Sequence, residues 1–322
     1  MNDKWERKEF IKRVGGGLVM SVPMVSVLAT LGGCNSNRSR NGDEELFVAR
    51  NFTEPDSFTS GVEGPAVDAD GNLYAVNYER QHTIGKVTPE GEASVFVELP
   101  DGSIANGIRF NSRGEMLLAD YTNHNILKVD MQTREISVHA HQPEMNQPND
   151  IAIDSNDRLY ASDPNWDEGT GQLWRIDPDG STTLLEKEMG TTNGVEVNPD
   201  ENKLYVNETR QRKVWVYDLS PEGEVSNKRL LIEFSPEYGM DGMRCDREGN
   251  LYITRHGKGT VAVISPDGEL IREINLAEGQ NTTNLAFGGP DGCTIYVTMA
   301  DVGNIQVFRS DIPGRSWQML QG

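Results

Sequence analysis

The chain has 322 residues, a formal net charge of −20 and a pI near 4.6. A surface this acidic disfavours nucleic acid as a partner, because binding a phosphate backbone requires a basic face. A neutral or cationic small molecule fits the charge better. The three cysteines form no metal–thiolate pattern, and Cys245 and Cys293 are expected to be isolated buried thiols.

The N-terminal segment has the features of an export signal. A basic start is followed by an apolar run that is too short and too rich in glycine for a permanent membrane span. The run ends in Leu31-Gly32-Gly33-Cys34, which resembles the bacterial lipobox and makes Cys34 the expected lipidation site. The stretch Arg7-Lys8-Glu9-Phe10-Ile11-Lys12 resembles a twin-arginine signal in which Lys8 replaces the second arginine, so twin-arginine export and the general secretory route both stay open. We therefore expect residues 1–33 to be a lipoprotein-type signal peptide and residues 34–43 to be the lipidated cysteine and a tether.

These features predict an exported lipoprotein that faces the periplasm or the exterior of a bacterium. Its contact with the membrane would be limited to the lipid on Cys34. Residues 44–322 would then form the folded domain.

A repeat organises that domain. A polar residue recurs about every 43 to 48 positions, close to the length of one four-stranded propeller blade. These residues are Glu63, Asn106, Asn149, Asn193, Asp241 and Asn284. About ten residues after each of them, a short apolar pair follows a segment rich in the turn-forming residues Gly, Asn and Asp. The pairs are Leu73-Tyr74, Leu117-Leu118, Leu159-Tyr160, Leu204-Tyr205, Leu251-Tyr252 and Ile295-Tyr296.

Each repeat is expected to contain four short strands separated by turns. The sequence thus predicts an all-β, six-bladed β-propeller with four-stranded blades; a β-sandwich with coincidental spacing is the alternative. Residues 45–52 have strand character and are expected to complete the last blade, because ring closure removes exposed sheet edges. A closed ring needs no partner to cover an edge, so a monomer is expected. Helical periodicity is absent beyond about the first thirty residues.

Equivalent positions in a closed ring point to a common axis, so the six polar side chains are expected to meet there. Glu63 and Asp241 supply two negative charges, while Asn149 and Asn193 supply neutral oxygens, a set that suits Ca²⁺. The histidines do not recur with the repeat, which argues against a zinc site built on imidazole. Other divalent cations, Mg²⁺, Mn²⁺ or Zn²⁺, stay open. At any single position, an Asn-Gly or Asp-Gly turn is the competing interpretation.

These segments resemble the regucalcin, gluconolactonase and luciferin-regenerating enzyme family of six-bladed propellers, over about residues 55–310. The matching segments are Glu63-Gly64-Pro65, Pro148-Asn149-Asp150, Thr192-Asn193-Gly194-Val195, Met240-Asp241-Gly242-Met243 and Asn284-Leu285-Ala286-Phe287-Gly288-Gly289. The resemblance implies that a divalent metal is held by Glu63, Asn149, Asn193 and Asp241. It also implies that Asn106 contacts substrate, or water at the metal.

The activity implied by the resemblance is hydrolysis of a sugar lactone, with Asp241 and Asn106 as catalytic residues. Asp241 would accept a proton from the attacking water. The expected substrate contacts are Asn106, Tyr121, Trp166, Arg255, His256 and Asn284.

Two alternatives stay open. The first is a hydrolase like diisopropylfluorophosphatase, although Arg244 stands where such members carry an aspartate. The second is a binding propeller without catalysis, braced by its metal.

Overall fold

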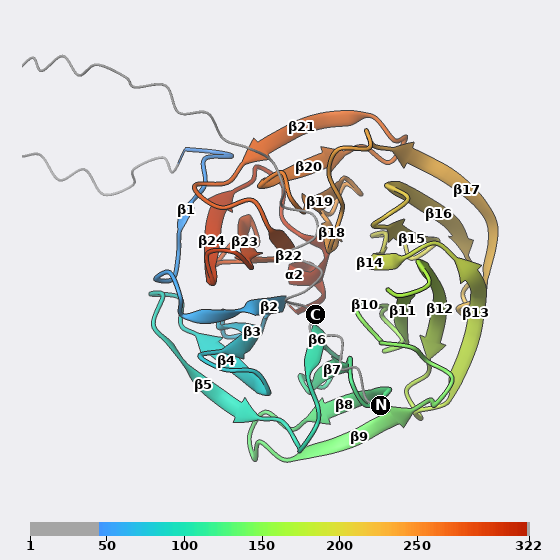
Figure 1. Cartoon of the computed structure of the whole chain (residues 1–322), viewed down its shortest axis with the longest axis horizontal. Helices are drawn as coiled ribbons and strands as arrows, with labels where there is room; N and C mark the ends of the chain where they lie inside the picture. Colours follow the sequence, from blue (N-terminus) through green and yellow to red (C-terminus); the bar gives the residue numbers. More distant parts are fainter. Residues whose placement is uncertain (1–44, 321–322) are drawn as a thin grey trace, which may run out of the picture. The chain divides into compact units, whose positions relative to one another are not determined.

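The computed structural model describes residues 45–320, so the predicted signal peptide, Cys34 and the tether lie outside the described residues. From Leu46 onward the chain forms one unit of six four-stranded sheets set around a central axis (Figure 1). The predicted six-bladed propeller is therefore confirmed. Within residues 45–320, no helix has the length and apolar character needed to cross a membrane.

Blades 1 to 5 each use four consecutive antiparallel strands, ordered from the axis outward. Blade 1 contains β2 (Phe58–Val67), β3 (Leu73–Tyr78), β4 (Thr83–Val87) and β5 (Ala93–Glu98). Blade 2 contains β6 (Ala105–Phe110), β7 (Met116–Asp120), β8 (Asn125–Val129) and β9 (Ile136–His141). Blade 3 contains β10 (Ile151–Ile153), β11 (Leu159–Asn165), β12 (Thr170–Ile176) and β13 (Thr182–Met189). Blade 4 contains β14 (Thr192–Val197), β15 (Lys203–Glu208), β16 (Lys213–Leu219) and β17 (Val225–Glu233). Blade 5 contains β18 (Met243–Cys245), β19 (Leu251–Arg255), β20 (Thr260–Ile264) and β21 (Leu270–Asn275).

Blade 6 combines strands from both ends of the domain and closes the ring. It contains β22 (Thr282–Gly288), β23 (Thr294–Met299), β24 (Asn304–Arg309) and the outermost strand β1 (Arg50–Asn51). Strand β1 pairs antiparallel with β24, as expected for residues 45–52, although two residues form the regular strand. The sequence did not predict the short helix α2 (Arg315–Leu320), because six residues are too few to show a helical period.

Most inner strands end at an Asp or Asn whose side chain builds the following turn. The Oδ1 atom of Asp68 accepts hydrogen bonds from the backbone N–H groups of Asp70 and Asn72, which forms an Asx turn. Equivalent side chains accept backbone hydrogen bonds in four other blades, from Asn111, Asp154, Asn198 and Asp246. This repeated turn explains why five of the blades reverse direction at the same distance from their recurring polar residue.

The core consists of six hydrophobic clusters, one between each pair of neighbouring blades. Successive strand side chains point to opposite faces, so each predicted apolar pair serves two clusters. In blade 1, Leu73 packs toward blade 6 and Tyr74 packs toward blade 2. The apolar pairs therefore hold the ring together on both sides of every blade, and their burial fixes the inner strands around the axis.

Candidate functional site

Five of the six recurring polar residues lie at or near the start of an inner strand, and Glu63 lies in the middle of the longer strand β2. Glu63, Asn106, Asn193 and Asn284 belong to β2, β6, β14 and β22, while Asn149 and Asp241 directly precede β10 and β18. Each inner strand contacts the next around the ring. All six residues are buried, and the most accessible of them, Asp241, is 6% exposed. The prediction that these positions are equivalent in the ring is therefore confirmed.

Glycines beside the polar residues allow neighbouring blades to approach closely. A Cβ atom on Gly64 would lie 1.9 Å from the backbone oxygen of Asn106, and one on Gly242 would lie 2.0 Å from Oδ1 of Asn284. The N–H of Gly107 donates a hydrogen bond to the backbone oxygen of Asn149, at 2.9 Å. Because these glycines have no side chain, the neighbouring inner strands approach closely, and this brings successive polar residues of the ring next to each other.

Replacing Gly64 by alanine should destabilise the propeller strongly. Gly64 has φ +54°, and the added Cβ would collide with backbone that cannot easily move. Gly114 is the matched control, because it has φ +73° but nothing within 4 Å of its Cβ position. We expect Gly64→Ala to cost about 1–3 kcal/mol more than Gly114→Ala in urea unfolding, the usual cost of overpacking. Equal losses would show that backbone strain, and not the approach of the blades, requires glycine there.

Three asparagine oxygens in this ring have no protein partner. They are the Oδ1 atoms of Asn106, Asn149 and Asn193, all of them buried. A buried polar atom left without a hydrogen bond costs about 1–3 kcal/mol, so three in one ring require an explanation. Amide and carboxylate oxygens are the ligands that Ca²⁺ takes, so the donor chemistry at the axis fits a hard dication.

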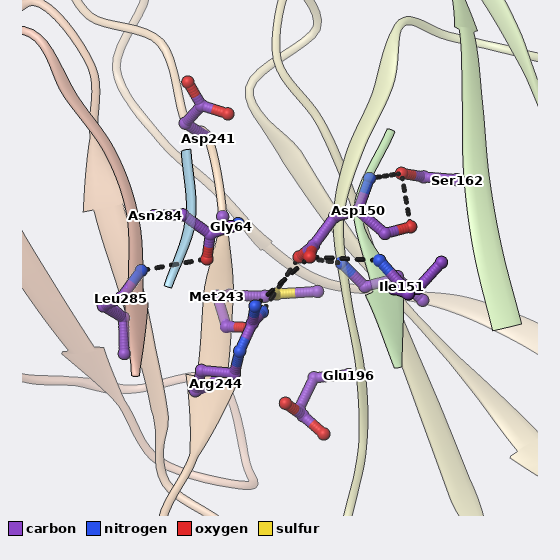
Figure 2. Close-up of polar contacts among 12 residues, drawn as sticks. Gly64, Asp150, Ile151, Ser162, Glu196, Asp241, Met243, Arg244, Asn284 and Leu285 are labelled. Carbon is purple, nitrogen blue, oxygen red and sulfur yellow. Dashed lines mark hydrogen bonds and ion pairs between the residues drawn. The ribbon is translucent and has the colours of Figure 1, made fainter. Parts of the chain in front are cut away.

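Two further oxygens of the ring, on Glu63 and Asn284, accept hydrogen bonds from backbone N–H groups. Oε2 of Glu63 accepts a hydrogen bond from the N–H of Gly64. Oδ1 of Asn284 accepts one from the N–H of Leu285 (Figure 2). Within residues 45–320 no group of three or more His, Cys, Asp or Glu residues is placed to hold a metal. Any metal bound by this ring must therefore depend on asparagine oxygens as well as on Glu63 and Asp241.

The structure places His256 beside Asp241. The Nδ1 atom of His256 lies 3.8 Å from Oδ2 of Asp241 and 3.1 Å from the backbone oxygen of Thr282. Arg255 is engaged elsewhere, because its guanidinium stacks on Phe234 at 3.9 Å and its Nε donates to the backbone oxygen of Gly239. Of Arg255 and His256, it is therefore His256 whose side chain lies close enough to Asp241 to act together with the polar ring.

Tyr121 and Trp166 follow the second strands of blades 2 and 3. These strands run antiparallel to the inner strands, so their ends lie beside the starts of the inner strands, where the polar ring is. Both side chains are partly exposed. This position is compatible with the predicted contact of Tyr121 and Trp166 with substrate. That contact stays a prediction, and so does the predicted contact of Asn284 with substrate.

Thr209 contributes to the site and was not predicted. Its Oγ1 accepts a hydrogen bond from Nδ2 of Asn193 at 3.1 Å and donates one to the backbone oxygen of Met240 at 2.8 Å. The first bond orients the amide of Asn193, and the second holds the residue that precedes Asp241. Thr209 directly follows β15, the place that Tyr121 and Trp166 occupy in their blades, and this shared position is the signal that could have found it.

A buried ionic cluster lies along the inner strands, past the polar ring. Arg244 donates to both carboxylate oxygens of Asp150, at 2.9 and 3.2 Å, so the pair joins blades 3 and 5 (Figure 2). Nη2 of Arg109 lies 3.8 Å from Asp150 and 3.9 Å from Glu196. Arg315 of α2 approaches Glu196 at 3.7 Å. Arg109, Glu196 and Arg244 each stand three residues after a polar ring residue, a regularity that could have been noticed in the sequence.

The comparisons with known proteins agree with this architecture. A family described as "SMP-30/Gluconolactonase/LRE-like region" matches residues 61–301. A gluconolactonase of Zymomonas mobilis is 30% identical over 73% of this chain and 75% of its own length. A pentonolactonase of Haloferax volcanii is 32% identical, over 47% of this chain and about half of its own length (53%). A solved structure named as regucalcin, a calcium-binding protein of Agrobacterium tumefaciens, superposes with a TM-score of 0.72 and 21% identity. That match covers 84% of this chain and 95% of the other.

Proposed function

Because the chain belongs to the family of the SMP-30/gluconolactonase/LRE-like region, we propose that it is a divalent-metal-dependent lactonase that hydrolyses a sugar lactone, with Ca²⁺ as its metal. The names of its relatives supply the class of substrate. The metal is inferred from the side chains of this chain. The proposed ligands are Glu63, Asn149, Asn193 and Asp241.

The observation that carries the metal proposal is the set of buried asparagine oxygens without a protein partner. Oδ1 of Asn149 and Oδ1 of Asn193 have this property, and both residues stand at the positions predicted to be ligands. Together with Glu63 and Asp241 they offer two charged and two neutral oxygen donors, which balance the charge of a dication. When bound, such a cation supplies a Lewis acid that polarises a carbonyl.

The remaining chemistry belongs to the side chains. Lactone hydrolysis adds water to the carbonyl carbon and breaks the ring C–O bond, which yields a hydroxy acid. Asp241 is the proposed acceptor of the proton that the attacking water loses, and His256 beside it can share or relay that proton. Asn106, whose Oδ1 has no protein partner, is the proposed residue that orients the water or the substrate. Burial of the ring limits competing water and strengthens each of these interactions.

A panel of five- and six-membered aldonolactones tests this proposal. The protein would be assayed metal-free and then with added Ca²⁺, Mg²⁺ or Mn²⁺, and acid release would be followed directly. We expect turnover that requires a divalent ion and is highest with Ca²⁺. Tight calcium binding without turnover of any lactone would overturn the lactonase and favour a binding propeller braced by its metal. Turnover that is equal with and without metal would overturn the metal-dependent mechanism.

Thr209 provides a test of the metal site that needs no substrate. Replacing it by valine removes the hydrogen bond that orients the Asn193 amide, whereas serine retains the hydroxyl. Changes to residues that orient metal ligands typically weaken metal affinity by about 10–100-fold. We expect Thr209→Val to weaken calcium binding by about tenfold or more in isothermal titration calorimetry, and Thr209→Ser to stay near wild type. Wild-type affinity in the valine variant would remove Thr209 as a positioning residue.

A further inference from the structure

A cavity lies toward the far end of the inner strands, beyond the polar ring. It has a volume of about 200 Å³ and is lined by residues that end these strands or follow them, among them Val67, Phe110 and Ile153. The proposed ligands Asn149, Asn193 and Asp241 stand at the starts of their inner strands and Glu63 in the middle of β2, and none of the four lines the cavity. Ser316 and Met319 of α2 line another part of its wall.

Two guanidinium groups reach this cavity from the buried ionic cluster. Arg109 and Arg244 both line it, and they are 6% and 3% exposed. At the other extreme, the lining residues Ser112 and Ser155 are exposed at the surface turns. The cavity thus extends from solvent-exposed turns to two buried positive charges.

The charge of Arg109 is incompletely compensated by the protein. Its Nη2 is buried without a hydrogen-bond partner, and the nearest carboxylates, of Asp150 and Glu196, stand 3.8 and 3.9 Å away. Asp150 already accepts two hydrogen bonds from Arg244. Burial, followed by the like charge of Arg244, lowers the pKa of Arg109 to about 10, even though both carboxylates act in the opposite direction.

Three other polar side chains of the lining, those of Ser112, Ser155 and Asp157, already take part in hydrogen bonds. The carboxylate of Asp157 accepts hydrogen bonds from both the N–H and the hydroxyl of Ser112. Ser155 donates in the same way to Glu201. Among the hydrogen-bond donors of the residues that line the cavity, Nη2 of Arg109 is buried and has no hydrogen-bond partner.

We propose that this cavity binds a small oxyanion, a monocarboxylate or inorganic phosphate, with Nη2 of Arg109 as its direct donor and Arg244 as a second positive charge. Guanidinium groups match the geometry of such anions, and a hydrogen bond between charged partners is about twice as strong as a neutral one. The site is independent of the proposed lactonase activity, since none of its residues belongs to the polar ring.

Thermal unfolding and calorimetry of the metal-free protein test this proposal. Acetate and phosphate would be titrated in parallel at constant ionic strength, with chloride as the balancing anion. We expect at least one of them to raise the melting temperature with a saturable dependence and to give a matching calorimetric isotherm. Acetate alone would identify a carboxylate site, and phosphate alone a phosphate site.

Three variants locate the binding. Arg109→Gln should weaken it by about tenfold or more, because a hydrogen bond to a charged group is lost. Ser316→Phe fills the cavity from α2 and leaves every charge in place, so it should weaken binding even if Arg109→Gln fails to fold. Arg113→Gln removes an exposed arginine from the neighbouring turn and should bind like wild type. Absence of saturable binding by both anions, or equal binding in the Ser316→Phe variant, would overturn the proposal.

Discussion

Replacing Asp241 by asparagine should abolish most lactone turnover and weaken calcium binding together. The substitution keeps the size of the side chain but removes one of the two negative charges in the proposed ligand set. It also removes the proposed proton acceptor. Loss of a residue that merely orients a ligand costs about 10–100-fold in metal affinity, so loss of a charged ligand should cost about 100-fold or more. Calorimetric titration with Ca²⁺ and initial rates with the best lactone measure the two effects separately.

Asp70→Asn is the charge-matched control for this experiment. Asp70 is exposed in the first turn of blade 1, so its replacement changes the net charge equally without touching the ring. We expect the control to keep wild-type affinity and turnover. An Asp241→Asn variant that binds calcium normally but loses turnover would remove Asp241 from the ligand set and leave it a proton acceptor. Normal turnover would contradict both roles.

The fold was predictable because its signals are local and repeated. Each apolar pair, such as Leu73-Tyr74, must face both neighbouring blades, so the same pattern recurs at every blade interface. The spacing between polar residues reflects the length of one blade, and turn residues such as Gly71 mark its reversals. Together these signals placed Glu63 and its equivalents on one axis without any knowledge of long-range contacts.

The regular spacing of Arg109, Glu196 and Arg244 did not reveal that their side chains meet, because the inner strands are irregular where the ionic cluster begins. The pairing of β6 with β7 shifts register between Ala105 and Ile108, and β14 shifts similarly between Thr192 and Val195. A bulge changes which face the following residues point to, so simple alternation cannot place Arg109 or Glu196. The contact of Arg315 with Glu196 depends on where α2 docks, a tertiary feature that a six-residue helix does not encode by itself.

The largest effect on stability should come from breaking the Arg244–Asp150 pair. Asp150 is fully buried and Arg244 is 3% exposed, so removing one partner leaves the other charge without adequate compensation. Breaking such a buried pair costs about 3–5 kcal/mol, whereas replacing both charges is often close to neutral. We therefore expect Arg244→Met to lower the free energy of unfolding in urea by about 3–5 kcal/mol.

The second variant in this comparison removes the stranded carboxylate. Asp150→Asn keeps an amide oxygen that can accept the hydrogen bond now given by the N–H of Ile151 at 3.0 Å. Combined with Arg244→Met, Asp150→Asn should recover a large part of the lost stability. The double variant no longer buries the carboxylate that had lost its Arg244 partner. Arg113→Met is the control, since Arg113 forms an exposed ion pair with Glu115, and such pairs contribute about 0–1 kcal/mol. If the double variant were no more stable than Arg244→Met alone, Arg244 would stabilise the propeller through packing rather than by compensating the charge of Asp150.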